Sequence, residues 1–188
     1  MRKKDDKKQE SIKKAVIKLI LEEGFHGTSI SKIAKEADVS PATVYVYYEN
    51  KDIMLHEIYF EYSEEILRNL LNKVSPNMAG NELLETLIES YYNYIKNNKE
   101  IFLFVEQFSS CPALIKSCEK RKGTKDFNNL LENFKKSKII KNYSNDTIIS
   151  LIFSPVKSIC MNQCITKAEK SKLLKELVQI LQYSLVIQ

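Results

Sequence analysis

The chain has 188 residues, of which 44% are hydrophobic, so it is long enough for one large domain or for a small head joined to a larger body. Its formal net charge of +5 permits DNA binding but is far below the net positive charge that is typical of an architectural nucleic-acid-binding protein. No apolar run reaches the roughly 18 residues that a membrane-spanning helix needs, and the charged residues 1–6 do not resemble a signal peptide. We therefore expect a cytoplasmic protein without membrane contact.

The cysteines suggest neither a metal site nor a redox motif. They are Cys111, Cys118, Cys160 and Cys164. Cys160 and Cys164 would share a helix face, which keeps a metal or redox pair open as an alternative, but their spacing is not Cys-x-x-Cys and the two histidines are distant. Buried free thiols that pack as small hydrophobes are the favoured interpretation. We predict no metal and no cofactor.

Apolar residues recur at helical spacing along the whole chain, and no stretch shows the period of two that is typical of strands. The expected fold is all-α with about nine helices. The periodic segments are residues 7–23, 29–37, 41–48, 51–74, 81–97, 99–109, 113–121, 124–137, 145–165 and 169–187. Pro155 falls inside one of them, so a kink or break is expected near Ser154.

Capping residues indicate where the first and fourth helices begin. Asp6 followed by Gln9 is a capping-box arrangement at the start of the first helix. Gly24 is placed to end that helix. Asn50 is the expected N-cap of the fourth helix, which is long and amphipathic.

Residues 30–47 form two short predicted helices joined by a tight turn, the arrangement of a helix-turn-helix. Thr28 and Ser40 are the expected N-caps of the two helices. Asp38 stands where glycine is usual, and aspartate tolerates the left-handed backbone at a cost of about 1 kcal/mol or less. Val44 is expected to anchor the second helix to the core.

The stretch that contains these helices resembles the DNA-binding signature of the TetR family. It has a Gly-aromatic-x-x-Thr lead-in, an Ile-Ala pair, Val-Ser before the second short helix, Thr-x-Tyr-x-Tyr-aromatic within it, and Lys51 at the start of the next helix. The resemblance to TetR/AcrR-family transcriptional regulators covers about the first 55 residues. It implies a three-helix DNA-binding head, residues 1–50, and a helical effector-binding and dimerisation domain, residues 51–188.

The candidate DNA contacts lie on or beside the second short helix. They are Thr28, Ser40, Pro41, Ala42, Thr43, Tyr45, Val46, Tyr47 and Lys51. The hydroxyls of Thr43, Tyr45 and Tyr47 suit phosphates or bases, and Thr28 at a helix N-terminus suits a phosphate. Lys51 is a cation where the helix dipole disfavours one, so a phosphate partner explains it better, and the family uses this lysine in that way. Val44 and Tyr48 are assigned to the core.

The recognition helix carries no arginine, asparagine or glutamine, so it cannot read guanine or adenine by paired hydrogen bonds. Pro41, Ala42 and Val46 offer apolar contacts that suit the methyl group of thymine. We therefore predict an A·T-rich, pseudo-palindromic double-stranded operator that is read partly by shape. The basic residues 2–4 are available for a neighbouring minor groove.

The last helix is apolar over more than one narrow stripe. Its apolar residues are Leu173, Leu174, Leu177, Val178, Ile180, Leu181 and Leu185. Such a width suits burial against both the subunit's own core and a partner, and the alternative is a wide contact within one subunit. One short recognition helix reads few base pairs, so specificity requires two heads, about 34–36 Å apart for half-sites one DNA turn apart. The resemblance likewise implies a homodimer formed by the last two helices.

Aromatic residues concentrate in the middle of the chain. The candidate effector-binding residues are Tyr62, Tyr91, Tyr94, Phe104, Phe108 and Phe127. Core packing explains most of these aromatic rings, but an apolar wall with hydroxyls also suits a small hydrophobic or aromatic effector. Glu106 and Gln107 are placed to orient a polar or cationic group.

Together these features predict a ligand-responsive, sequence-specific DNA-binding regulator. The expected form is a dimeric repressor that its effector releases from the operator by a shift in conformational population. We do not expect an enzyme, because the sequence has no glycine-rich phosphate loop, no metal-binding His-Glu spacing and no Ser/His/Asp set. The alternatives are an activator of the same family and a helical protein-interaction module that no longer binds DNA.

Overall fold

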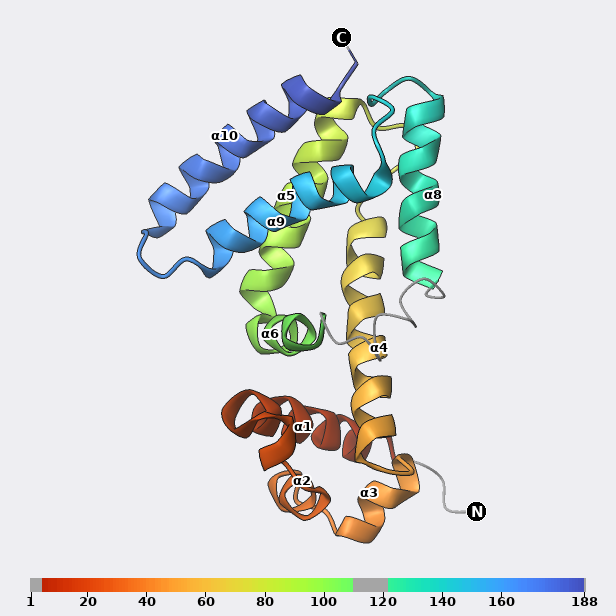
Figure 1. Ribbon diagram of the computed structural model, residues 1–188, viewed down its shortest axis with the longest axis vertical. Coiled ribbons are helices and arrows are strands. Elements are labelled where there is room, and N and C mark those ends of the chain that lie inside the picture. Colours follow the sequence, from red (N-terminus) through yellow and green to blue (C-terminus); the bar gives the residue numbers. More distant parts are fainter. Residues whose placement is uncertain (1–4, 110–121, 188) are drawn as a thin grey trace. The chain divides into compact units, whose positions relative to one another are not determined.

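A computed structural model describes residues 5–109 and 122–187. These residues form the helices α1 (Asp6–Gly27), α2 (Ile30–Glu36), α3 (Pro41–Tyr47), α4 (Lys51–Leu71), α5 (Gly80–Asn97), α6 (Lys99–Phe108), α8 (Lys122–Lys136), α9 (Asn145–Met161) and α10 (Lys167–Leu185) (Figure 1). An isolated antiparallel bridge joins Ile140 to Val186. The all-α prediction is therefore confirmed. The predicted helix at 113–121, together with Cys111, Cys118 and the basic residues 2–4, lies outside the described residues.

The chain divides into two compact units. The described residues of unit 1 are 5–63 and 99–109, and those of unit 2 are 64–98 and 122–187. The first part of α4 thus belongs to unit 1, together with α1, α2, α3 and α6. The functional boundary expected at residue 50 stays a prediction. Along the described residues, no helix has both the length and the apolar character needed to cross a membrane.

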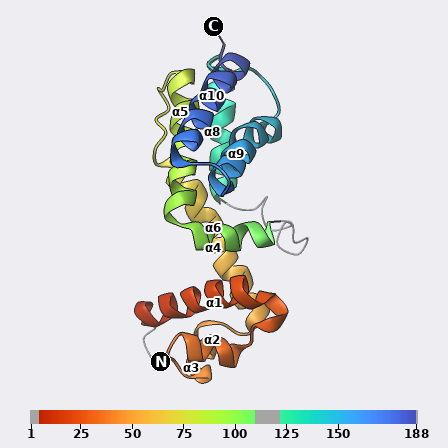
Figure 2. The ribbon, with the colours of Figure 1, turned by 90° about the vertical axis from the view of Figure 1, so that its left-hand side faces the viewer.

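In unit 1, α1 packs against α2 and α6, and α2 packs against α3 (Figure 2). The apolar stripe of α1, formed by Ile12, Ala15, Val16, Leu19 and Ile20, is buried. Met54 and Ile58 of α4 are buried as well. The N-cap of α1 is Asp5, whose side chain accepts a hydrogen bond from the backbone N of Lys7, so the capping box expected at Asp6 is wrong by one residue. Gly24, at φ 74°, ends the regular part of the helix as expected, because this backbone conformation favours glycine.

In unit 2, α5 packs against α9 and α10, and α9 also packs against α8. The ring of Phe153 lies 4.7 Å from that of Tyr91 and 5.6 Å from that of Phe127, which joins three helices through aromatic contacts. A kink or break was expected near Ser154; helix α9 continues through Pro155 to Met161, so a break does not occur and the kink stays a prediction. Burial of Ile152 and Val156 on either side of the proline holds the helix together.

The cysteines that the structure describes differ from the prediction of buried thiols. Cys160 and Cys164 are thiols, and the Sγ of Cys160 lies 4.0 Å from the carbonyl of Tyr92. Cys160 is half-buried in the last turn of α9, but Cys164 is exposed after the helix has ended at Met161. The predicted helix extended to residue 165, and its early end places Cys164 in a loop.

Candidate nucleic-acid interface

A tight turn between α2 and α3 forms the helix-turn-helix. Asp38 adopts the left-handed conformation predicted for it, with φ 53°. The backbone N–H of Val39 donates to the carbonyl of Ala34 over 2.9 Å, which closes the turn. Ile33 and Ala34 are fully buried, and so is Val44 on α3. The small side chain of Ala34 lets the two helices approach, and Val44 anchors the second helix as expected.

The start of α3 is capped as the sequence predicts. The Oγ of Ser40 accepts a hydrogen bond from the backbone N of Thr43 over 3.1 Å, and Pro41 is the first helical residue. The hydroxyls of Ser40 and Thr43 also bond to each other over 2.9 Å. Both hydroxyls are thus oriented by the helix itself, and Thr43 is only half-exposed.

One face of α3 projects into solvent. Tyr45 is 56% exposed and Val46 is 51% exposed, although both are large side chains on a short helix. Pro41 and Ala42 are exposed in the preceding turn. Val44 and Tyr48 are buried, as predicted, so the helix alternates cleanly between an anchored side and a presented side. The presented side is hydroxyl-bearing and apolar and carries no charge.

Tyr47 does not lie on this face. Its ring is buried, and its hydroxyl donates to the carbonyl of Asp5 over 2.9 Å and accepts from the backbone N–H of the same residue over 3.0 Å. The prediction that Tyr47 faces outward is therefore wrong. The partner is 42 positions away in the sequence, so local periodicity on α3 could not reveal it.

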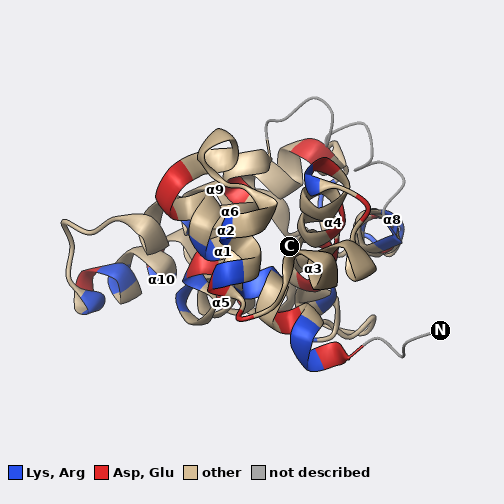
Figure 3. Cartoon of the chain, turned by 90° about the horizontal axis from the view of Figure 1, so that it is seen from below, with Lys and Arg blue, Asp and Glu red and all other residues tan. Residues whose placement is uncertain are grey.

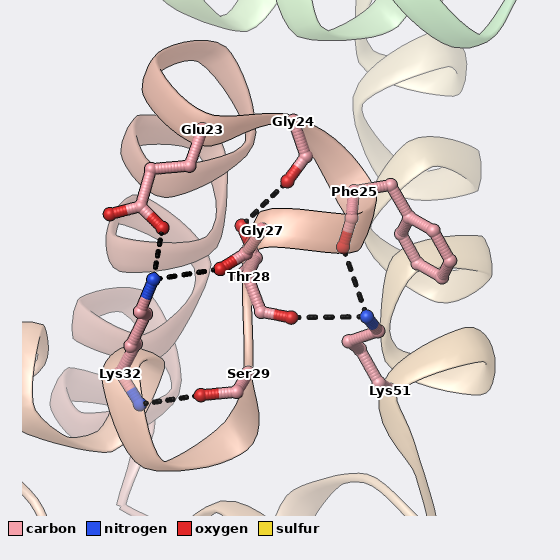
Figure 4. Close-up of polar contacts among 8 residues, drawn as sticks. All are labelled: Glu23, Gly24, Phe25, Gly27, Thr28, Ser29, Lys32 and Lys51. Atoms are coloured by element: carbon pink, nitrogen blue, oxygen red, sulfur yellow. Dashed lines mark hydrogen bonds and ion pairs between the residues drawn. The ribbon is translucent and has the colours of Figure 1, made fainter.

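Thr28 has a different role from the one expected. Its side chain is buried, and the hydroxyl donates to the carbonyl of Gly24 over 2.9 Å (Figure 4). The N-cap of α2 is Ser29, whose Oγ accepts from the backbone N of Lys32. The capping role predicted for Thr28 is therefore wrong by one residue, because its hydroxyl closes the last turn of α1, after the kink at Gly24.

Lys51 binds the same turn. Its Nζ donates to the carbonyls of Phe25 and Thr28 over 2.9 and 3.0 Å, and it lies 4.0 Å from the centre of the Phe25 ring (Figure 4). Two carbonyl dipoles and an aromatic face stabilise the cation at the helix N-terminus. These contacts explain the position of Lys51 without a phosphate.

Several lysines of the head pair with acidic residues of the same unit. Lys18 Nζ lies 2.6 Å from Glu36, and Lys32 Nζ lies 2.6 Å from Glu23 and 2.9 Å from the carbonyl of Gly27. Figure 3 shows basic and acidic segments interspersed on the helices. A count of lysines therefore overstates the positive charge that this surface offers to DNA.

A buried cation joins α1 to α4 within unit 1. Only 5% of the side chain of Lys13 is exposed; its Nζ pairs with Glu61 over 2.7 Å and also with Glu10. Burial lowers the pKa of Lys13, but the hydrogen bonds to Glu10 and Glu61 raise it more, so the pKa lies above its ordinary value. Sequence reasoning missed this lysine, which falls within the apolar stripe of α1.

The six candidate effector residues are all buried but fall in different units. Tyr62, Phe104 and Phe108 belong to unit 1, and Tyr91, Tyr94 and Phe127 belong to unit 2. In unit 2 the hydroxyl of Tyr94 donates to Glu65 over 3.1 Å. Phe153, which the sequence reasoning did not select, completes the aromatic cluster with Tyr91 and Phe127.

Unit 2 presents a large apolar surface on its last two helices. On α10, Ile180 is 61% exposed and Tyr183 is 77% exposed, and Leu173 is exposed on the same helix. Leu151 is exposed on α9. Only Leu181 and Leu185 of the apolar residues of α10 are fully buried. Soluble proteins seldom expose so many large apolar side chains together unless a partner covers them.

Comparison with known proteins identifies the head. Residues 12–58 match the family model described as bacterial regulatory proteins, tetR family. A TetR family transcription regulator from Marinobacter aquaeolei VT8 has the same fold, with a TM-score of 0.80, 22% identity and coverage of 100% of both chains. The DNA-binding head of the chain, residues 12–58, therefore matches the TetR family.

The similar proteins differ in how much of the chain they match. The fatty acid metabolism regulator protein of Bacillus subtilis is 26% identical over 92 residues, which are 49% of this chain and 47% of that protein. The chain thus spans about half the length of this relative. FadR from Bacillus subtilis, solved in complex with stearoyl-CoA, superposes with a TM-score of 0.70 at 23% identity and covers 90% of this chain and 97% of that one.

Proposed function

We propose that this chain is a ligand-responsive, sequence-specific DNA-binding transcriptional regulator. The observation that carries the proposal is the helix-turn-helix, in which α3 is anchored through Val44 while Tyr45 and Val46 are about half exposed. A short helix held from one side and presented on the other has the geometry needed to enter a major groove.

The presented face favours A·T-rich DNA. Pro41, Ala42 and Val46 supply apolar contacts to thymine methyl groups, and the hydroxyl of Tyr45 supplies a bond to a phosphate or base. Ser40 and Thr43 are placed at the first turn of the same helix. Lys51 has three N–H donors for two carbonyl acceptors, so one donor is available for a phosphate. Thr28 and Tyr47 are buried, and we propose that they support the surface and do not touch DNA.

Selection from a random double-stranded library tests the DNA-binding proposal. Wild-type protein should enrich an A·T-rich pseudo-palindrome, and its affinity for that site should fall steeply with salt. Tyr45→Ala should weaken binding to the selected site about tenfold. Tyr143→Ala is the matched control, because this tyrosine is also exposed but lies in unit 2. Enrichment of G·C-rich half-sites would refute the A·T preference, and no enrichment at all would refute sequence-specific binding.

A homodimer through α9 and α10 is the assembly we propose. The exposed Ile180, Tyr183, Leu173 and Leu151 would be buried in such an interface. A pseudo-palindromic operator requires two heads related by a two-fold axis, which a symmetric dimer supplies. Sedimentation velocity at low micromolar concentration should give twice the mass of the 21.8 kDa chain.

The proposed effector is a small hydrophobic or aromatic molecule bound in the helical body, where buried aromatic rings are frequent. The complex of FadR with stearoyl-CoA makes a long-chain acyl-CoA the first compound to test. Fluorescence anisotropy of labelled operator DNA measures its release from the protein. Stearoyl-CoA is the test compound, and free coenzyme A is the control. A coupling of about 1–3 kcal/mol would weaken operator binding about 5–150-fold.

Repression is the proposed outcome, with the protein acting in the cytoplasm and without enzymatic activity. An effector that strengthens operator binding, or a promoter that loses expression when the gene is deleted, would favour the activator alternative. DNA binding that is neither salt-dependent nor sequence-dependent would favour the protein-interaction module.

A further inference from the structure

The hydroxyl of Tyr47 holds the backbone of one residue from both sides. It donates to the carbonyl of Asp5 over 2.9 Å and accepts from the N–H of Asp5 over 3.0 Å. The ring of Tyr47 is buried at the end of α3, so packing of the recognition helix holds the hydroxyl in place. The end of α3 and the residue that begins α1 are therefore joined directly.

Asp5 in turn organises the first turn of α1. Its side chain accepts from the N–H of Lys7 over 3.0 Å. Its carbonyl accepts from the N–H of Lys8 over 3.0 Å and from the N–H of Gln9 over 3.2 Å. The position and direction of this turn thus depend on the residue that Tyr47 holds.

The first turn of α1 carries two exposed lysines, Lys7 and Lys8, beside the acidic Asp5 and Asp6. Lys7 and Lys8 are exposed, and in the part of the chain that the structure describes neither forms an ion pair. Lys13, Lys18 and Lys32 are all paired with carboxylates. Like the exposed Lys14 and Lys35, Lys7 and Lys8 therefore keep ammonium groups that can bind a phosphate.

We propose that Tyr47 is a positioning residue for DNA binding. It places the first turn of α1 so that Lys7 and Lys8 bind phosphates of the same DNA site that α3 enters. The proposal rests on the proposed DNA-binding function and deepens it. Phosphate contacts of this kind set the register of a protein on the duplex. A tyrosine that the sequence suggested as a direct contact thus acts through two lysines of another helix.

Salt-dependent binding tests the proposal. The probe is a fluorescent A·T-rich duplex about three helical turns long, titrated between about 50 and 200 mM salt. Loss of two phosphate contacts in K7Q/K8Q should reduce the slope of log affinity against log salt by about 1.8. Tyr47→Phe keeps the ring but loses the hydroxyl, so it should reduce the slope by about 1–2 and weaken binding about three- to tenfold. Adding Tyr47→Phe to K7Q/K8Q should then change nothing further.

Matched controls separate this role from general damage to the fold or from a loss of total charge. K125Q/K136Q removes two exposed lysines of α8, and Tyr143→Phe removes an exposed hydroxyl of unit 2; both should leave the slope unchanged. The proposal is overturned if Tyr47→Phe leaves the slope unchanged, or if it weakens the K7Q/K8Q protein as much as it weakens the wild type. Wild-type protein that binds the duplex without salt dependence would overturn DNA binding itself.

Discussion

Lys13 allows a sharp test of how unit 1 holds a buried charge. The lysine side chain is 5% exposed, whereas the side chains of Glu10 and Glu61 are about half exposed, at 53% and 48%. Replacing both acids in E10Q/E61Q leaves a buried cation without a counter-ion. Breaking a fully buried pair in this way costs about 3–5 kcal/mol, and solvent screening of the half-exposed acids reduces the expected loss to about 2 kcal/mol.

The opposite substitution should be far milder. Lys13→Met replaces the buried cation with an apolar side chain of similar length and leaves two carboxylates that water can solvate, so we expect a change of no more than about 1 kcal/mol. Thermal melts at neutral pH measure both effects. E10Q/E61Q should lower the Tm by about 4–8 °C, and Lys13→Met should lower it by less than about 4 °C.

The dependence on pH supplies an independent check. The pKa of Lys13 is higher in the folded protein than in the unfolded chain. Its ion pairs therefore stabilise the fold fully at any pH below the ordinary lysine pKa. This stabilisation is lost as the pH rises through the pKa of the folded protein. Without the acids, burial lowers the pKa of Lys13, so the charged form destabilises the fold most at low pH. The difference in unfolding free energy between wild type and E10Q/E61Q should therefore shrink between pH 7 and about pH 10. Equal losses for Lys13→Met and E10Q/E61Q, or a difference that does not vary with pH, would refute this reasoning.

Three further substitutions test other parts of the structure. Asp38→Val should lower the unfolding free energy by about 1–2 kcal/mol, because a β-branched residue is strained at φ 53°, whereas Asp38→Gly should not lower it. The denaturant midpoint of unfolding measures both variants, and equal midpoints would argue against backbone strain. Lys51→Met should lower the Tm by about 2–4 °C in the absence of DNA, because it removes the two hydrogen bonds to the carbonyls of Phe25 and Thr28. An unchanged Tm would mean that these hydrogen bonds do not stabilise the fold. The double variant I180E/Y183E should be a monomer in sedimentation velocity, whereas Tyr143→Glu should remain a dimer. If I180E/Y183E is still a dimer, the interface lies elsewhere.

Local chemistry made much of the helix-turn-helix predictable from the sequence. Ser40 before Pro41 and Asn50 before Lys51 mark helix starts, because a capping side chain bonds to backbone groups three residues away. Asp38 in the left-handed turn and the anchor Val44 follow from the same short-range geometry.

Contacts made by the folded chain explain what the sequence did not predict. Tyr47 and Lys51 lie at positions where a DNA-facing side chain is reasonable, but packing brings Asp5 and Phe25 to them from 42 and 26 positions away. A buried lysine in the stripe of α1 likewise makes sense only once Glu61 of α4 is beside it. The division of the aromatic residues between two units also depends on tertiary packing, which composition does not encode.

The brevity of α3 has a genetic consequence. Seven residues are too few for a helix to persist alone in water, so α3 exists only because Val44, Tyr47 and Tyr48 are buried against the rest of the head. The shape offered to DNA is therefore a property of the hydrophobic core. A screen for loss of DNA recognition should recover substitutions at Ile33 and Val44 as readily as at Tyr45. Heat sensitivity would separate the two groups, since only the core substitutions should also shorten the lifetime of the protein in the cell.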